Sequence, residues 1–365
     1  MLLRHRSRVV VGLSGGVDSS AAAALLLEHG HDVVGVHLQM RPPSCRIGPF
    51  EEPAPSGGLA DARRVCDQLG IPFQAVDCTE AFQREVIAPF AAEYRAGRTP
   101  NPCVLCNRHI KFATLLQTAR ELGADYIATG HYACIQHPVG SGRHLLRRAQ
   151  DTKQDQTYFL FAMTQEELAC ALFPLGEFTK ANVRALACAR GLPTAEKRQS
   201  QEICFIPDND YGRFLLDSGL ATPRRGEIVN RQGRILGRHD GIELFTVGQR
   251  RGLRIAAPRP LYVLELDPAR NRVVVGEAEE LASSAFQVER CNWVAWPEPP
   301  PAFQALAKIR YQHKGASVRA ECLPDGALLV HPQEPQRAVT PGQACVFYQD
   351  DLLLGGGWIA SARPV

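Results

Sequence analysis

The feature that most constrains the fold is a glycine- and serine-rich turn between a β-branched run and a helical run. The turn reads Ser14-Gly-Gly-Val-Asp18-Ser-Ser20; it follows the apolar segment 8–13 and opens the alanine- and leucine-rich segment 18–29. Glycines allow backbone N–H groups to converge on one point, and a helix N-terminus adds positive potential there. The serine hydroxyls can donate further hydrogen bonds. The pattern predicts a strand, an anion-binding loop and a helix, as at the start of a nucleotide-binding α/β domain.

This loop differs from the best-known phosphate loops. It contains neither G-x-x-x-x-G-K-[ST] nor G-x-G-x-x-G, so the lysine that neutralises terminal phosphates in γ-phosphoryl transfer is missing. The difference favours a loop that grips the pyrophosphate of ATP while AMP is transferred. Asp18 would stand beside a phosphate, which predicts a Mg²⁺ ion between them. The heptapeptide resembles the SGGxDSS signature of the PP-loop ATP pyrophosphatase superfamily; a plain glycine turn with a serine N-cap is the alternative interpretation.

Strand-like and helix-like segments alternate through the first two hundred residues of this 365-residue chain. The predicted strands cover 8–13, 32–39, 73–77 and 126–129, and the predicted helices cover 18–29, 60–69, 79–94 and 109–122. Such alternation is typical of an α/β protein with a doubly wound parallel sheet. Short strand-like runs follow at 227–229, 234–236 and 242–247, and apolar strands between proline-rich turns follow from about residue 285. We predict an ATP-binding catalytic domain over 1–206, a small, mostly-β central domain over 207–280 and a C-terminal β-barrel over 281–365.

Arginine is concentrated in one part of the chain. Residues 224–254 hold eight arginines and three acidic residues, a net charge of +5, whereas the whole chain has a formal net charge of +3. This window predicts a polyanionic partner, although a solvated face with spare arginines explains the charge equally well. No apolar run approaches the roughly 18 residues that suggest a membrane-spanning helix. We expect a cytoplasmic protein without a membrane partner.

Three of the twelve cysteines are singled out by their context. Cys103 and Cys106 form a Cys-x-x-Cys pair within the segment 99–107, and Cys204 follows much later in the chain. We expect Asn107 to cap the next helix, which would place Cys106 at a helix N-terminus and lower its thiol pKa. The pair alone is compatible with redox chemistry, metal binding or coincidence. A structural zinc site would need four ligands at regular spacing, which these cysteines do not provide.

Eight segments, in chain order, carry a resemblance to one family. They are GLSGGVDSS (12–20), RTPNPCVLCN (98–107), ATGHY (128–132), DQTYFL (155–160), FPLG (173–176), ICFI (203–206), TVGQRRGL (246–253) and KIRY (308–311). With these segments, which span nearly the whole chain, the sequence resembles the tRNA-specific 2-thiouridylases. The resemblance implies a Rossmann-like PP-loop domain and a reaction in two stages. ATP adenylates the C2 oxygen of the wobble uridine, and a cysteine persulfide then replaces that oxygen with sulfur, so that pyrophosphate and AMP are released.

The resemblance also implies roles for individual residues. Cys204 resembles the cysteine that carries the persulfide, and Cys106 resembles the partner that forms a transient disulfide with it. Cys103 stands where some members have aspartate, which leaves its role open. The residues implied to bind ATP are Gly12, Leu13, Ser14, Gly15, Gly16, Val17, Asp18, Ser19, Leu38 and Gly130. Those implied to contact tRNA are Asn101, Pro102, Cys103, His131, Gln154, Asp155, Gln156, Arg310, Tyr311 and Gln343. With this resemblance, we expect the central domain over 207–280, with its basic window, and the C-terminal barrel to hold tRNA through phosphate contacts.

The implied cofactors and partners are consistent with the chemistry. They are ATP with Mg²⁺, tRNAs of the Glu, Gln and Lys type, and a cysteine desulfurase or sulfur-relay protein as the sulfur donor. A uridine carbonyl is a poor electrophile, AMP is a good leaving group, and a persulfide attacks as its thiolate. The target base must leave its stack to reach both reactants, so we expect base flipping.

Three alternatives stay open from the sequence. Another PP-loop adenylating enzyme, such as a ligase, would not require Cys106 and Cys204. An iron–sulfur cluster on Cys103, Cys106 and Cys204 could carry the sulfur without a persulfide. A non-catalytic RNA-binding protein with an ATP-like fold would release no pyrophosphate.

Overall fold

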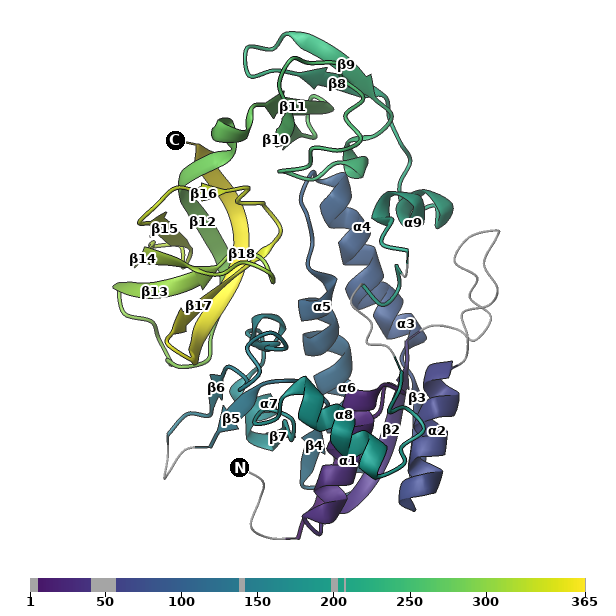
Figure 1. Cartoon of the computed structure of the whole chain (residues 1–365). Helices are drawn as coiled ribbons and strands as arrows, with labels where there is room; N and C mark the ends of the chain where they lie inside the picture. Colours follow the sequence, from purple (N-terminus) through teal and green to yellow (C-terminus); the bar gives the residue numbers. More distant parts are fainter. Residues whose placement is uncertain (1–5, 41–56, 138–141, 198–202, 207, 365) are drawn as a thin grey trace. The chain divides into compact units, whose positions relative to one another are not determined.

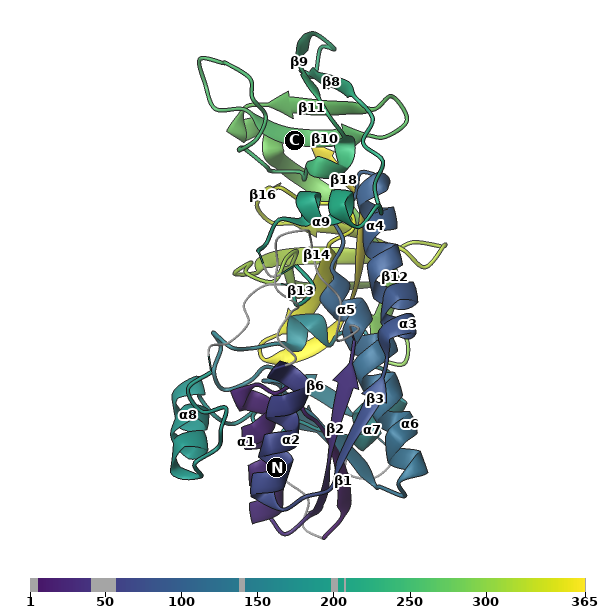
Figure 2. The same ribbon diagram turned by 90° about the vertical axis from the view of Figure 1, so that its right-hand side faces the viewer.

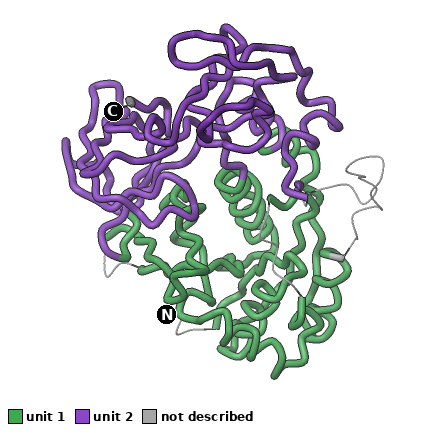
Figure 3. The backbone as a smooth tube through the Cα atoms, turned by 45° about the horizontal axis from the view of Figure 1, so that its top comes forward, with its two compact units in different colours: residues 1–86, 103–204, 351–353 green, residues 87–102, 205–350, 354–365 purple. Residues whose placement is uncertain are grey.

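The structure is a computed structural model that describes residues 6–40, 57–137, 142–197, 203–206 and 208–364. The chain divides into two compact units, drawn in green and purple in Figure 3. The first unit comprises residues 1–86, 103–204 and 351–353. The second unit comprises residues 87–102, 205–350 and 354–365.

The first unit is built on a five-stranded parallel sheet in the order β3-β2-β1-β4-β7. Figure 1 labels its strands β2, β3, β4 and β7. Its strands are β1 (Arg8–Gly12), β2 (Asp32–Gln39), β3 (Phe73–Asp77), β4 (Tyr126–Ala128) and β7 (Ala171–Leu172). The order reverses at β1, because the chain continues to β2 on one side and later to β4 on the other. A doubly wound sheet binds its ligands beyond the carboxyl ends of the strands at such a reversal. The predicted fold class is confirmed, and the reversal marks the loops after β1 and β4.

Helices cover both faces of this sheet. Figure 2 shows α1 (Val17–Glu28) and α2 (Gly57–Leu69) on one face and α6 (Ala113–Glu121) on the other. The three valines of β1 therefore have no exposed surface. A continuous β-branched run suits such a central parallel strand, because both of its faces need apolar side chains. Gly30, beyond the end of α1, takes φ +81°, as a glycine that stops a helix commonly does.

One continuous helical stretch carries the Cys-x-x-Cys pair. It runs through α5 (Pro102–Leu105), the π-helical η2 (Cys106–Phe112) and α6 without a break. Pro102 takes the first position, where its missing N–H costs little. The predicted helix start behind Asn107 is therefore wrong. Cys106 lies beyond the first four helical residues, whose N–H groups supply the positive end of a helix.

The first unit also contains elements that the sequence analysis did not predict. A hairpin of β5 (Cys134–Gln136) and β6 (Leu145–Arg147) pairs through β6 with the first two residues of β18 (Leu352–Pro364). The 3₁₀ turn η3 (Thr157–Phe159) and two helices, α7 (Gln165–Cys170) and α8 (Lys180–Ala189), complete the unit. Thr164 caps α7 in a capping box with Glu167, and Thr179 caps α8.

An aromatic cluster joins the helices of the second unit. The helical stretch of α3 (Thr79–Phe82) and η1 (Gln83–Ile87), which belongs to the first unit up to residue 86, continues in the second unit as α4 (Ala88–Arg95). The helix α9 (Tyr211–Asp217) follows later in the second unit. Phe90 of α4 meets Phe205 and Phe214 with ring centroids 5.3 and 6.2 Å away. Tyr94 and Tyr211 stack at 4.4 Å. These contacts fix α9 against α4, because large aromatic rings contribute most of the buried area at such a junction.

A small mixed sheet follows in the second unit, in the order β10-β11-β8-β9. Its strands are β8 (Gly226–Val229), β9 (Ile235–His239), β10 (Tyr262–Asp267) and β11 (Arg272–Gly276). The predicted strand over 242–247 is wrong: the 3₁₀ turn η4 (Ile242–Leu244) occupies its start. Ile242 and Phe245 are both buried, and three residues per turn bring such a pair to one face.

The rest of the second unit is a closed barrel. After the turn η5 (Ala278–Leu281), the strands are β12 (Ala282–Trp293), β13 (Ala302–Lys308), β14 (Ala316–Cys322), β15 (Leu328–Pro332), β17 (Ala344–Gln349) and β18. The sheet closes where β12 pairs with β18, and the short β16 (Gln336–Arg337) adds to β12. The predicted mostly-β centre and C-terminal barrel are confirmed. In the parts of the chain that the structure describes, no helix has the length and hydropathy to cross a membrane.

Candidate active site

The glycine–serine loop connects β1 to α1 at the reversal of the sheet. Gly16 is the N-cap of α1, and no side chain accepts a hydrogen bond in a cap there. The hydroxyls of Ser19 and Ser20 instead donate to the Gly16 carbonyl oxygen, at 3.1 and 2.9 Å. The Ser14 N–H donates to the Ser19 hydroxyl at 3.2 Å. The serines thus shape the loop without capping the helix, which leaves its N-terminus suited to an anion.

Two glycines around this loop have no room for a side chain. Gly15 takes φ +74°, and a Cβ atom there would lie 2.5 Å from the Gly58 carbonyl oxygen. Gly130 follows β4, and a Cβ atom on it would lie 2.6 Å from the Ser19 nitrogen. Gly15 therefore lets the loop approach Gly58 of α2, and Gly130 lets the segment after β4 approach the loop, as closely as only glycine permits.

The carboxylate of Asp18 is bound by groups from two distant segments. The ammonium of Lys180, the first residue of α8, lies 2.6 and 2.7 Å from its two oxygens. The hydroxyl of buried Tyr132 donates to Asp18 Oδ1 at 2.8 Å. The positive charge that is missing from the loop itself is therefore supplied by a residue 162 positions later. No sequence motif marked Lys180.

A second lysine reaches the loop from the end of the first unit. The ammonium of Lys197 donates to the Gly15 carbonyl oxygen at 2.9 Å and lies 2.5 Å from Asp61 Oδ2. Burial raises the pKa of Asp61, but hydrogen bonds from Lys197 and Arg64 outweigh burial and hold that pKa below its ordinary value. Asp61 is thus a charged anchor that keeps Lys197 on the loop.

The structure offers no preformed set of protein metal ligands among the residues that it describes. Over the described ranges, no three His, Cys, Asp or Glu side chains gather as metal ligands. Lys180 contacts both carboxylate oxygens of Asp18, and a role of Asp18 toward Mg²⁺ stays a prediction. Cys103, Cys106 and Cys204 are all described, and they do not form a cluster-binding set.

The three singled-out thiols differ in exposure. Cys106 is only 6% exposed, and its sulfur lies 3.9 Å from that of Met40. Cys103 is half-buried and Cys204 is exposed. All three are free thiols. The first unit therefore holds one thiol that solvent can reach, Cys204, and one that is protected from solvent, Cys106.

Electrostatics links these thiols to Lys111, on the π-helical η2. Burial raises the pKa of Cys106 to about 12 and that of Cys103 to about 11. The positive charge of Lys111 lowers both pKa values, whereas the negative charge that Cys204 can carry raises them. The predicted lowering of the Cys106 pKa is therefore wrong, because burial outweighs every favourable charge.

His131 lies in the same neighbourhood. Its Nδ1 is 2.7 Å from the Thr129 hydroxyl, and its ring lies 5.8 Å from those of Phe112 and Phe173. Burial, and secondly the charge of Lys111, lower the pKa of His131 well below its ordinary value, so the ring is neutral. His131 follows Gly130, which contacts the loop. The dipeptide therefore connects the loop with the surroundings of Lys111 and the thiols.

The DQT segment holds the backbone beside Tyr132. Asp155 is 6% exposed, and its carboxylate accepts hydrogen bonds from Ala149 N and from the Thr157 N–H and hydroxyl, at 2.9–3.3 Å. The Gln156 side chain accepts from Tyr132 N at 3.0 Å. Gln154 is half-buried next to them. Asp155 and Gln156 thus order this segment, and their predicted contacts with tRNA stay a prediction.

The predicted site residues of the second unit lie on the barrel and on the segment before α5. The Gln343 amide donates to the carbonyl oxygens of Thr99 and Pro100, both at 3.1 Å. Asn101 is buried. Arg310 is exposed and Tyr311 is half-buried, with Lys308 5.7 Å above the Tyr311 ring. Gln343 therefore holds the peptide that leads into the Cys-x-x-Cys helix.

Leu38 is the remaining predicted ATP contact. It stands near the carboxyl end of β2, opposite Val76 of β3. It is half-buried, whereas Val33, Val34 and Val36 earlier in β2 are buried. A partly exposed leucine at this end of the sheet can contact an adenine ring, whereas a fully buried core leucine could not.

Known families match along almost the whole chain. The model of the tRNA methyl transferase HUP domain matches residues 7–208, that of the tRNA methyl transferase PRC-barrel domain residues 214–277, and that of the aminomethyltransferase beta-barrel domain residues 283–359. Two solved structures align at low likeness. The U34-tRNA thiolase NcsA from Methanococcus maripaludis has a TM-score of 0.35 at 18% identity, over 60% of this chain and 72% of that one. A 4-thiouridine synthetase has 0.36 at 19%, over 56% and 46%. With TM-scores this low, neither alignment indicates the function of this chain.

Full-length relatives are far more similar. The tRNA-specific 2-thiouridylase MnmA of Geotalea uraniireducens is 51% identical over 98% of this chain and 96% of its own length. The protein of the same name from Geobacter metallireducens is 50% identical over 99% of both chains. Identity at this level over the full length leaves no room for a different family. The chain belongs to the tRNA-specific 2-thiouridylases.

Proposed function

We propose that this chain is a tRNA-uridine 2-sulfurtransferase, which adenylates the C2 oxygen of a wobble uridine with ATP and replaces it with sulfur. One observation carries the proposal. A single compact unit holds the glycine–serine loop and the thiols of Cys103, Cys106 and Cys204. Gly130 touches the loop. The positive charge of Lys111 lowers the pKa of the neighbouring His131 as well as the pKa values of Cys103 and Cys106.

On the nucleotide side, the loop binds the phosphates of ATP. The residues proposed for this are Gly12, Leu13, Ser14, Gly15, Gly16, Val17, Asp18, Ser19, Leu38 and Gly130. We add Lys180, whose ammonium can turn from Asp18 to an arriving phosphate, since a dianion competes well with one carboxylate. A Mg²⁺ ion that arrives with ATP counts as part of that substrate. The uridine oxygen attacks the α-phosphate, the bond to pyrophosphate breaks, and an AMP ester forms on the base.

On the sulfur side, the exposed Cys204 receives a sulfur atom from a cysteine desulfurase or relay protein and carries it as a persulfide. The terminal sulfur attacks C2 of the activated uridine, and AMP leaves with the former C2 oxygen. The Cys106 thiolate then attacks Cys204 Sγ, which breaks the persulfide S–S bond and leaves sulfur on the base. The resulting Cys106–Cys204 disulfide takes two electrons from a cellular thiol reductant before the next turnover.

On the RNA side, we propose tRNA as the substrate, because the relatives are named as tRNA-specific enzymes, and within it the Glu, Gln and Lys types that the family resemblance implies. The residues proposed to contact it are Asn101, Pro102, Cys103, His131, Gln154, Asp155, Gln156, Arg310, Tyr311 and Gln343. The neutral ring of His131 suits a place beside a flipped base, which needs hydrogen bonds without a competing charge. The domain boundaries at 206 and 280 and a cytoplasmic location, where thiol reductants are available, remain part of this proposal.

Nucleoside mass spectrometry tests the function directly. Cells that lack this protein should lose 2-thiouridine from their tRNA, and the full-length chain should restore it. Unchanged 2-thiouridine in the deletion strain contradicts the proposal. In vitro, the purified chain should release pyrophosphate only when ATP and tRNA are both present; no release would favour a non-catalytic RNA-binding protein.

Cysteine variants separate the remaining alternatives. Cys106→Ser and Cys204→Ser should each abolish sulfur transfer while pyrophosphate release continues, because the adenylation step needs neither thiol. Full activity of either variant favours a ligase-like enzyme. Anaerobic purification with a visible absorption spectrum tests the iron–sulfur alternative, since a cluster absorbs in the visible range and a persulfide does not.

A further inference from the structure

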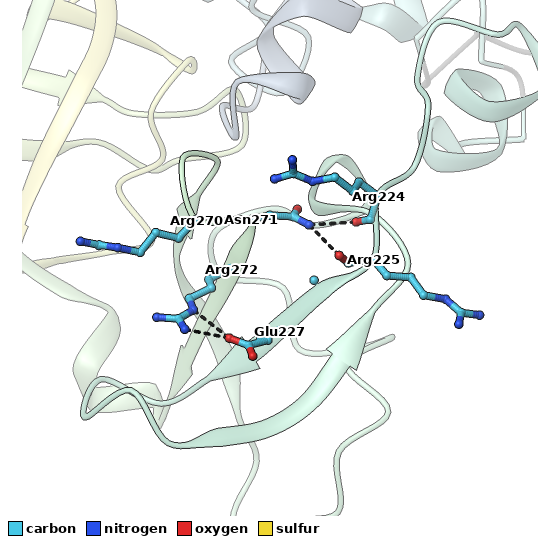
Figure 4. A pocket seen from close by; sticks show the side chains of 7 residues that line it. Arg224, Arg225, Glu227, Arg270, Asn271 and Arg272 are labelled. Carbon is cyan, nitrogen blue, oxygen red and sulfur yellow. Dashed lines mark hydrogen bonds and ion pairs between the residues drawn. The ribbon is translucent and has the colours of Figure 1, made fainter.

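The small mixed sheet of the second unit has a pocket lined by arginines. Its volume is about 560 Å³, and it is lined by Arg224, Arg225, Gly226, Glu227, Arg270, Asn271 and Arg272 (Figure 4). We call it the arginine pocket. Two of its arginines come from the basic window 224–254; of the other two, Arg270 lies in the turn between β10 and β11, and Arg272 is the first residue of β11. Only the tertiary structure joins these two stretches.

A buried asparagine holds the two stretches together. Asn271 is 8% exposed and takes φ +53°, a left-handed conformation that few residue types other than glycine tolerate. Its amide donates to the carbonyl oxygens of Arg224 and Arg225, at 3.1 and 2.9 Å. A Cβ atom on Gly226 would lie 2.2 Å from the Asn271 carbonyl oxygen, so the two backbones touch. The arginines thus extend from an ordered backbone.

The charge of the arginine pocket is strongly unbalanced. Four arginines line it against one carboxylate, Glu227, which Arg272 holds at 2.9 Å. Arg225 and Arg270 have acidic neighbours outside the lining, at 3.5 Å and 3.2 Å, but their side chains are 86% and 75% exposed. Such exposed ion pairs contribute little to stability, so their arginines remain available to bind an anion.

The directions of the side chains distinguish between two kinds of anion. In Figure 4 the guanidinium groups of Arg224, Arg225 and Arg270 point away from one another. A compact anion would need them to converge on one point. A chain of phosphates presents its charges one after another and suits a diverging set. Arg224, Arg225 and Arg270 are all exposed to solvent.

We infer that the arginine pocket binds successive backbone phosphates of the RNA substrate and reads no base. This inference rests on the proposed function and adds a specific phosphate-contact site to it. Such contacts raise affinity independently of sequence and make it steeply dependent on salt. They have no part in the chemical step, so they should act on the binding of tRNA alone.

The test compares two triple variants of the full-length chain. The pocket variant is Arg224→Gln/Arg225→Gln/Arg270→Gln. The control variant is Arg84→Gln/Arg259→Gln/Arg319→Gln, which makes the same change in net charge at exposed arginines outside the pocket. The affinity for an unmodified tRNA transcript is measured by fluorescence anisotropy over a series of KCl concentrations. Thermal unfolding checks that both variants are folded, and a triple lysine variant at the pocket positions keeps the charge.

We expect the pocket variant to reduce the slope of log K against log salt by about one per arginine removed. Its KM for tRNA should rise about tenfold or more, with kcat within about twofold of the parent chain. The lysine variant should restore most of the slope. A slope equal to that of the parent chain, or an equal loss in the control variant, overturns the inference. If the slope falls as expected but the parent chain releases no pyrophosphate with tRNA and ATP, the proposed function fails and the RNA site stands.

Discussion

The ammonium of Lys180 lies 2.6 and 2.7 Å from the two carboxylate oxygens of Asp18. Their side chains are 15% and 22% exposed, so the pair is partly shielded from water. Asp18 belongs to the first turn of α1, where the helix end also favours a negative charge. We expect a phosphate of arriving ATP to compete with Asp18 for the Lys180 ammonium.

Lys180→Met should reduce pyrophosphate release, measured as kcat/KM for ATP, by about 10²-fold, the size of effect seen when one charge-stabilising donor is removed. Lys180→Arg keeps the charge and should lose much less. Lys153→Gln, on an exposed lysine of the same unit, serves as the control. Equal activity of the methionine variant and the parent chain would show that Lys180 serves only to hold Asp18.

Gly130→Ala should damage the loop. The added Cβ would lie 2.6 Å from Ser19 N and 2.7 Å from Asp18 C, so backbone atoms must move. We expect a loss of about 1–3 kcal/mol in the free energy of unfolding, together with a large rise in the Kd for ATP. Gly123→Ala is the matched control, because its φ of +61° strains the backbone but no atom lies within 4 Å of its Cβ. The control should lose stability and keep its affinity for ATP.

The thiol of Cys106 should react slowly at neutral pH. Burial raises its pKa to about 12, so its protonated form is favoured and the thiolate fraction at pH 7 is about 10⁻⁵. The rate of alkylation by iodoacetamide, followed by peptide mass spectrometry, should rise about tenfold per pH unit over the range in which the protein stays folded. The buried Cys345 reports unfolding. A rate at Cys106 that levels off below pH 9 contradicts this assignment.

Lys111→Met should make Cys106 less reactive still. The charge of Lys111 lowers the pKa of Cys103 and Cys106, so its removal raises both pKa values and lowers the thiolate fraction at any given pH. We expect alkylation of Cys106 to slow about two- to tenfold, which corresponds to a rise of up to about one pKa unit. Lys111→Arg should preserve the rate. An unchanged rate in Lys111→Met would show that the charge of Lys111 does not affect the reactivity of Cys106.

Gln343→Ala should destabilise the second unit. It removes two hydrogen bonds and leaves the carbonyl oxygens of Thr99 and Pro100 without that donor. We expect a loss of about 1–3 kcal/mol in the free energy of unfolding, measured by denaturant titration. Gln333→Ala, at an exposed glutamine of the same barrel, is the control. If the affinity for tRNA falls while the stability does not, Gln343 contacts the RNA instead of organising the protein.

The local sequence predicts elements well where one pattern dominates. The strands 32–39 and 73–77 have their predicted bounds, because β-branched runs between turns have few alternatives. The helix behind the Cys-x-x-Cys pair shows the opposite case. Asn107 has the local preference of an N-cap, but the helix begins at Pro102 and passes through Asn107 as a π-helical turn. Burial of the helix outweighed a capping preference worth about 1 kcal/mol.

The sequence by itself determined the β–loop–α motif, the doubly wound sheet and the barrel, because these follow from short-range patterns and ordered motifs. It also singled out Cys103, Cys106 and Cys204 as the candidate thiols. Only the tertiary structure brought Lys180 and Lys197 to the loop, set the thiol pKa values by burial, and joined two arginine stretches around Asn271. Ion pairs, desolvation and pockets depend on distances between residues far apart in the chain, and a local pattern does not encode those distances.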